Sequence, residues 1–176
     1  MSSPKKIVST ALLIAAGVAL PLAFHALPNA GRVFLPMHIP VLLCGLLCGF
    51  PWGLACGVIT PLLSTLLTGM PPAAMLPAML CELAAYGLVS ALLARHSPVK
   101  NPYARVYLAL AGAMLSGRLV QGALNALVFS AGSYSLRLWL TGAFVTALPG
   151  IAIQAVLIPA IVFGLQKAKL MDMKHW

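Results

Sequence analysis

The sequence predicts an all-α polytopic membrane protein, a single domain over residues 1–176 that crosses the bilayer six times. Hydrophobic residues make up 61% of the chain and charged residues 7%, and the mean hydropathy is +1.01. A soluble domain has an apolar share of roughly 45–50%. In addition, Pro and Gly repeatedly interrupt the apolar residues 31–90. Such interruptions are tolerated at membrane depth only where the backbone is buried in protein or lines a cavity, which predicts a pocket.

The apolar runs and the breaks between them define the six helices, since a bilayer-crossing helix needs roughly 20 apolar residues. The breaks are Pro28-Asn29, Pro51, residues 69–72, residues 96–102 and residues 131–135. The predicted helices cover residues 7–26, 33–50, 52–68, 74–95, 104–130 and 138–165. The first run also fits a signal peptide, but it ends at Leu27-Pro28 without a convincing cleavage site, so we expect it to remain as a helix.

The distribution of Lys and Arg predicts that both termini are cytoplasmic. In that orientation the outer side carries only Arg32 and Arg137, and the other basic residues outside the helix centres lie on the inner side, as the positive-inside rule expects. The net charge of +9 is therefore assigned to the membrane surface. The basic residues form no stripe and accompany no nucleic-acid motif, so no nucleic-acid partner is expected.

Two rows of small residues recur at four-residue spacing. The first consists of Ala11, Ala15, Ala19 and Ala23, and the second of Gly45, Gly49, Gly53 and Gly57. Small residues let helices approach closely in lipid. The alanine row fits either internal packing or docking onto another subunit, and the glycine row fits packing of the second helix on the third.

Polar side chains at membrane depth are costly and are functional candidates by default. Glu82 and Tyr86 share one face of the fourth predicted helix, and Arg118, Gln121 and Asn125 share one face of the fifth. The depths of Glu82 and Arg118 differ by roughly 6 Å, which long side chains can bridge. These residues are expected either to form a substrate-binding wall or, for the charged pair, to fix the helix register.

Other polar and sulfur-containing residues are assigned mainly structural roles. His38, near the outer mouth of the second helix, is expected to be a hydrogen-bond donor beside the substrate site, and Gln154 an interhelical hydrogen-bonding residue. The cysteines lack CxxC spacing and a partner His, so they are interpreted as packing residues, and no metal site is expected. They are Cys44, Cys48, Cys56 and Cys81.

Three segments carry a resemblance to a known family. LPMHIPVLLCG (residues 35–45), TPLLSTLLTGMPP (residues 60–72) and ELAAYG (residues 82–87) resemble the substrate-binding S components of energy-coupling factor (ECF) vitamin transporters. The resemblance implies six helices in the bacterial cytoplasmic membrane and an outward pocket formed by the last three helices and capped by the loop after the first. It also implies partners, a transmembrane coupling protein (T component) and two ATPase subunits, with the alanine row as the docking surface.

The sequence contains no phosphate-binding loop and no catalytic constellation, so neither an enzymatic activity nor a cofactor is expected. Nickel and cobalt relatives within the resembled family rely on His and Met at the extreme N-terminus, whereas this chain begins Met1-Ser2-Ser3-Pro4, which argues against a metal substrate. An intramembrane Arg118 suits a vitamin with a carboxylate, and pantothenate is the first candidate. Alternatives are a stand-alone secondary transporter with Glu82 as a proton site and a structural membrane protein.

Overall fold

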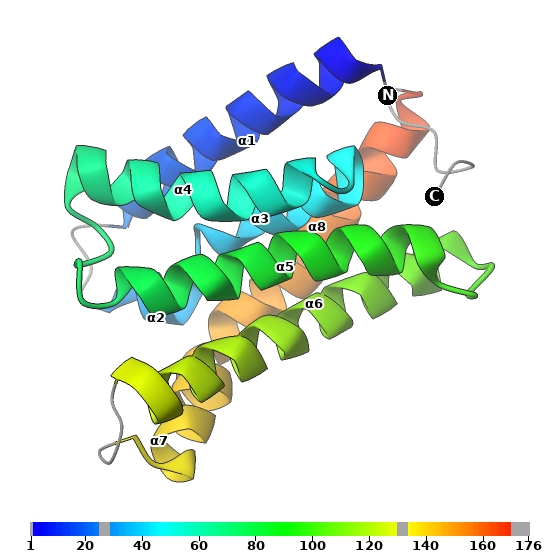
Figure 1. Ribbon diagram of the computed structural model, residues 1–176. Coiled ribbons are helices and arrows are strands. Elements are labelled where there is room, and N and C mark those ends of the chain that lie inside the picture. The colour runs from blue at the N-terminus through cyan, green and yellow to red at the C-terminus, as the bar shows by residue number, and fades with distance from the viewer. Residues whose placement is uncertain (1, 25–28, 130–133, 170–176) are drawn as a thin grey trace.

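The computed structural model describes residues 2–24, 29–129 and 134–169, and within these ranges all regular elements are helices (Figure 1). The elements are α1 (Ser3–Ala23), α2 (Ala30–Phe34), α3 (His38–Cys48), α4 (Trp52–Thr68), α5 (Leu76–His96), α6 (Pro102–Leu124), η1 (Asn125–Phe129), α7 (Leu136–Leu140), η2 (Thr141–Thr146) and α8 (Leu148–Lys167). The elements η1 and η2 are π-helices.

Helices lie in all six predicted ranges, with three differences, and the predicted helix ends at residues 26 and 130 lie outside the described residues. The predicted helix 33–50 is two helices, because Leu35 adopts a left-handed conformation with φ 52° and the following Pro36 disfavours a helical conformation at residue 35. The predicted helix 104–130 changes from α to π geometry at Asn125. The predicted helix 138–165 consists of α7, η2 and α8.

Four helices in the described residues are long and apolar enough to cross a membrane. They are Ser3–Ala23, Ala30–Cys48, Leu76–His96 and Leu148–Lys167. The segment Ala30–Cys48 combines α2 and α3, and α4 is a shorter apolar helix of 17 residues. Length and composition therefore support four spans, and the crossing of α4 and α6 stays a prediction.

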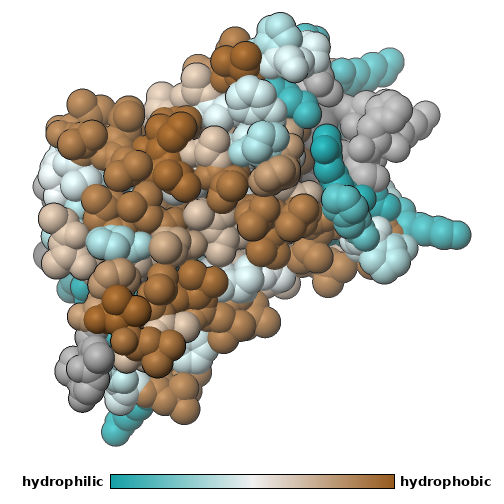
Figure 2. Space-filling view, in the orientation of Figure 1, coloured by the Kyte–Doolittle hydropathy of each residue, from teal (hydrophilic) through white to brown (hydrophobic). Residues whose placement is uncertain are grey.

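The ends of the molecule differ in polarity. Figure 1 shows that α1 begins and α8 ends at the same end, where the connection between α5 and α6 also lies. Figure 2 shows hydrophilic side chains concentrated at this end and an apolar surface over most of the remaining visible face. This arrangement agrees with a bundle whose basic end lies at one membrane surface.

The core lies around α3, whose Val41, Leu42 and Cys44 are fully buried. Glycines allow α3, α4 and α5 to meet at their backbones. A Cβ atom at Gly53 would lie 2.5 Å from the carbonyl oxygen of Gly87 and 2.7 Å from the Cα of Gly45. The predicted packing of the second helix on the third through glycines is confirmed, and α5 is a third participant that the four-residue spacing did not indicate.

Candidate functional site

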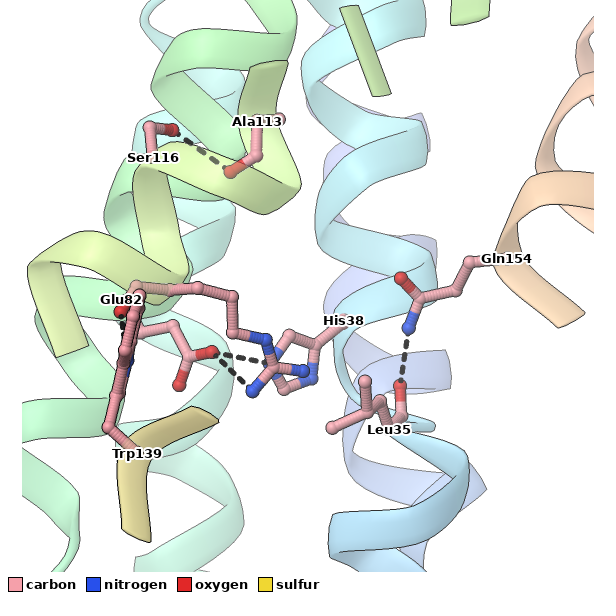
Figure 3. A network of polar contacts seen from close by, with 8 residues as sticks. Leu35, His38, Glu82, Ala113, Ser116, Trp139 and Gln154 are labelled. Carbon is pink, nitrogen blue, oxygen red and sulfur yellow. Dashed lines mark hydrogen bonds and ion pairs between the residues drawn. The ribbon is translucent and has the colours of Figure 1, made fainter. Parts of the chain in front are cut away.

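A buried cluster of charged and polar side chains joins three helices in the part of the bundle that lies away from the basic end. Glu82 on α5 lies in its centre: its Oε1 atom is 3.1 Å from Nη1 of Arg118 on α6 and 3.4 Å from Nε2 of His38, the first residue of α3 (Figure 3). All three residues are at most 7% exposed. The structure thus confirms that the side chains of Glu82 and Arg118 meet, and it adds His38 to them.

Two nitrogen atoms of this cluster are buried and have no hydrogen-bond partner among the residues that the structure describes. They are Nη2 of Arg118 and Nδ1 of His38. Because a carboxylate only accepts hydrogen bonds, Nε2 of His38 must donate to Glu82, which leaves Nδ1 of a neutral imidazole as an acceptor. Buried polar atoms are normally paired, and exceptions need a specific explanation. A ligand that pairs with these two atoms is one such explanation.

Tyr86 packs beside the cluster. Its ring lies 5.0 Å from the His38 ring in an edge-to-face arrangement, and the side chain is 1% exposed. A Cβ atom at Gly117 would lie 2.5 Å from Cδ2 and Cε2 of the Tyr86 ring. The glycine at position 117 therefore allows α6 to approach α5 closely enough for Arg118 to reach Glu82.

The other two residues predicted on this wall lie outside the ion-pair cluster. Asn125 donates its side-chain amide to the carbonyl oxygen of Gln121 at 2.8 Å, within its own helical segment. Gln121 is half-buried, and its side chain interacts with Tyr134. Burial raises the pKa of the Tyr134 phenol above its ordinary value, and the charges of Glu82 and Arg118 reach it. Gln121 and Tyr134 thus extend the polar region outward from the ion pair.

Trp139 on α7 is a site residue that sequence reasoning missed. Its indole Nε1 donates to the carbonyl oxygen of Arg118 at 3.0 Å. A Cβ atom at Gly122 would come within 2.9 Å of the indole, so this glycine provides the space that the ring occupies. The available signal in the sequence was the pair of glycines on either side of Arg118, at positions 117 and 122.

Gln154 confirms its expected role as an interhelical hydrogen-bonding residue. Its Nε2 atom donates to the carbonyl oxygen of Leu35 at 3.4 Å, which links α8 to the turn between α2 and α3 (Figure 3). Figure 3 shows Gln154 beside His38 and Leu35, so it lies next to the polar cluster.

The alanine row lies on a surface of α1 that faces away from the bundle. All of its members are exposed: Ala11, Ala15, Ala19 and Ala23. The inner face of α1 is formed instead by Thr10, which is 3.5 Å from the Cys44 sulfur, and by Gly17, which packs on Thr60 of α4. Internal packing within this chain therefore does not account for the row.

Three of the cysteines are buried among α1, α3 and α4 and fit the predicted packing role, namely Cys44, Cys48 and Cys56. Cys81 is exposed, so that role does not extend to it. In the part of the chain that the structure describes, no group of three His, Cys, Asp or Glu side chains could hold a metal ion.

A bundle of apolar helices around a buried, partly unpaired polar cluster defines a membrane protein with a candidate binding site. Comparison with protein families gives a match over residues 5–162 to the family described as "ECF transporter, substrate-specific component". The chain belongs to this family, which confirms the resemblance seen in the sequence. No curated protein and no solved structure matches the chain significantly. The protein is therefore a substrate-binding subunit of a transporter, a role distinct from that of an enzyme.

Proposed function

We propose that this chain captures a water-soluble vitamin bearing a carboxylate from outside the cell and delivers it through an ECF-type importer. The observation that carries the proposal is Nη2 of Arg118, a buried guanidinium nitrogen that has no partner in the described part of a chain from the substrate-specific family. A guanidinium binds carboxylates through strong charge-assisted hydrogen bonds. Pantothenate is the first candidate, since its carboxylate suits Arg118 and its hydroxyl and amide groups suit Gln121, Asn125 and Tyr86.

The exposed alanine row supports docking onto the T component, which would connect this subunit to two ATPases. Side chains that are small and unpartnered within the bundle let a second helix approach closely in lipid. The basic end of the bundle would then face the cytoplasm, and the Glu82–Arg118 cluster would face the outside. Family membership favours this importer role over a stand-alone proton-coupled transporter that uses Glu82.

The proposal is tested by measuring binding of labelled pantothenate, biotin, folate and cobalamin to the purified chain in lipid nanodiscs. We expect saturable binding of a carboxylate-bearing vitamin by the chain alone. The matched control is Ser116→Ala. Within the described residues this hydroxyl donates to the carbonyl oxygen of Ala113 in its own helix, so affinity should be unchanged. Binding of a vitamin that lacks a carboxylate, with no binding of the acids, would contradict the role given to Arg118.

A further inference from the structure

The proposed carboxylate site, on which this inference rests, already contains an ion pair, and this pair affects the cost of binding a charged ligand. Glu82 is an anion 3.1 Å from Arg118, so the two formal charges cancel before any ligand arrives. A carboxylate added to this buried pair would leave one negative charge uncompensated. Uncompensated charge is expensive in a buried site. A second positive charge beside the ligand would remove this cost.

His38 is placed to supply that charge. Its imidazole already contacts Glu82 through Nε2, at 3.4 Å, and its Nδ1 atom is buried with no partner within residues 2–24, 29–129 and 134–169. In the neutral ring Nδ1 offers only a lone pair. Protonation would place a hydrogen on Nδ1 and create a donor that requires an acceptor. Imidazole is the side chain that changes charge readily near neutral pH.

Few other ionisable groups face His38. On α5 they are Glu82 and Tyr86, and on α6 the group is Arg118. The basic residues of α1 and α8, two helices packed on α3, lie at the opposite end of α3. Lys6 on α1 lies beside Cys48, the last residue of α3, because its carbonyl oxygen contacts the Cys48 sulfur. Lys167 is the last residue of α8. On α4 the ionisable residue is Cys56, which contacts Thr60. His38 is thus the remaining source of a compensating charge in the described cluster.

We propose that the substrate carboxylate binds between Nη2 of Arg118 and Nδ1 of His38, and that His38 takes up one proton from solvent as the ligand binds. One carboxylate oxygen accepts from each nitrogen. The cluster then contains two positive and two negative charges, Arg118 and His38 against Glu82 and the ligand. Both unpaired nitrogens gain partners, and no net charge is left buried.

The experiment is a titration of ligand affinity against pH, using the full-length chain in nanodiscs. The probes are pantothenate and its neutral alcohol analogue panthenol, between pH 5.5 and 8.5. We expect the affinity for pantothenate to fall by up to tenfold per pH unit as the pH rises, because one proton is linked to binding. The affinity for panthenol should not change with pH, since it brings no charge into the site.

Two further measurements separate His38 from other groups. Calorimetry of the unmodified chain in two buffers with different ionisation enthalpies should give an uptake approaching one proton per pantothenate bound above neutral pH. The variant His38→Gln keeps a side-chain donor to Glu82. It should bind pantothenate weakly at every pH, and its affinity should not fall as the pH rises.

The outcomes also distinguish this inference from the proposed function. Saturable binding of pantothenate with no proton uptake and no pH dependence would overturn the role of His38 and leave the carboxylate site at Arg118 intact. If the affinity of His38→Gln for pantothenate still falls as the pH rises, the role of His38 would likewise be overturned. Absence of carboxylate binding across the whole pH range would overturn both.

Discussion

Nη1 of Arg118 lies 3.1 Å from Oε1 of Glu82, so the two charges that the sequence places at membrane depth form an ion pair between α6 and α5. In the described part of the chain, Oε1 accepts both bonds of the cluster, and Nη2 of Arg118 has no hydrogen-bond partner. The pair therefore stabilises the helix arrangement and still has hydrogen-bonding capacity for a ligand.

The first prediction separates these two roles. Arg118→Gln should destabilise the protein by about 3–5 kcal/mol, the usual range for stranding one member of a buried ion pair. The double variant Arg118→Gln with Glu82→Gln should regain most of that stability, because no buried charge is left unpaired, and should still fail to bind pantothenate. Thermal unfolding in nanodiscs and equilibrium binding measure the two effects. Recovery of stability and pantothenate binding together would contradict the ligand role of Arg118.

The second prediction concerns the glycine contact among α3, α4 and α5. Gly53→Ala should lower stability by about 1–3 kcal/mol, since the added methyl group meets backbone atoms of Gly87 and Gly45 that cannot move away independently. Gly164→Ala on α8 is the matched control. Among the described residues nothing lies within 4 Å of a Cβ atom there, so the change should be neutral or stabilising by about 0.5–1 kcal/mol. Equal unfolding temperatures for the two variants would count against the close packing.

The third prediction concerns the attachment of α7 to the site. Trp139→Phe removes the indole donor to the carbonyl oxygen of Arg118 and retains an aromatic ring beside Gly122. The cost should be about 0.5–1.5 kcal/mol, the net value of a typical hydrogen bond. Hydrogen exchange should then increase over residues 136–140 and stay unchanged in α4. Unaltered exchange at α7 would show that this bond does not hold the segment.

The fourth prediction tests the docking surface. Ala15→Trp with Ala19→Trp should abolish transport and leave ligand binding intact, because both residues are exposed on α1 and bulky side chains would prevent helix approach. Ala111→Trp, a change at an exposed alanine on α6, is the control and should leave transport unchanged. If the double variant also loses ligand binding, the row supports the fold of this subunit instead of its docking.

Much of the fold could be predicted because apolar runs and helix breakers follow directly from the bilayer. The helix α4 has the predicted bounds 52–68. The break at Leu35 was missed because a single residue before a proline gives little signal within a continuous apolar run. The change to π geometry at Asn125 was missed because the apolar run continues through it, and an apolar run does not distinguish α from π geometry.

The site could be predicted in part for the same reason. Depth and helical spacing are local properties, and they were sufficient to bring Glu82 and Arg118 together. His38 was recognised as a polar residue near the outer mouth, but its contact with Glu82 joins positions 44 residues apart. Trp139 contacts a backbone carbonyl 21 residues away, and no sequence spacing indicates such a bond.

The measurement that tests the central claim most directly is substrate uptake into proteoliposomes. The chain is reconstituted alone or together with an ECF T component and its two ATPases, with ATP supplied on the ATPase side. We predict that the chain alone binds its vitamin but does not concentrate it, and that accumulation requires the complete complex and ATP hydrolysis. Accumulation by the chain alone, driven by an imposed proton gradient and lost in Glu82→Gln, would contradict the account.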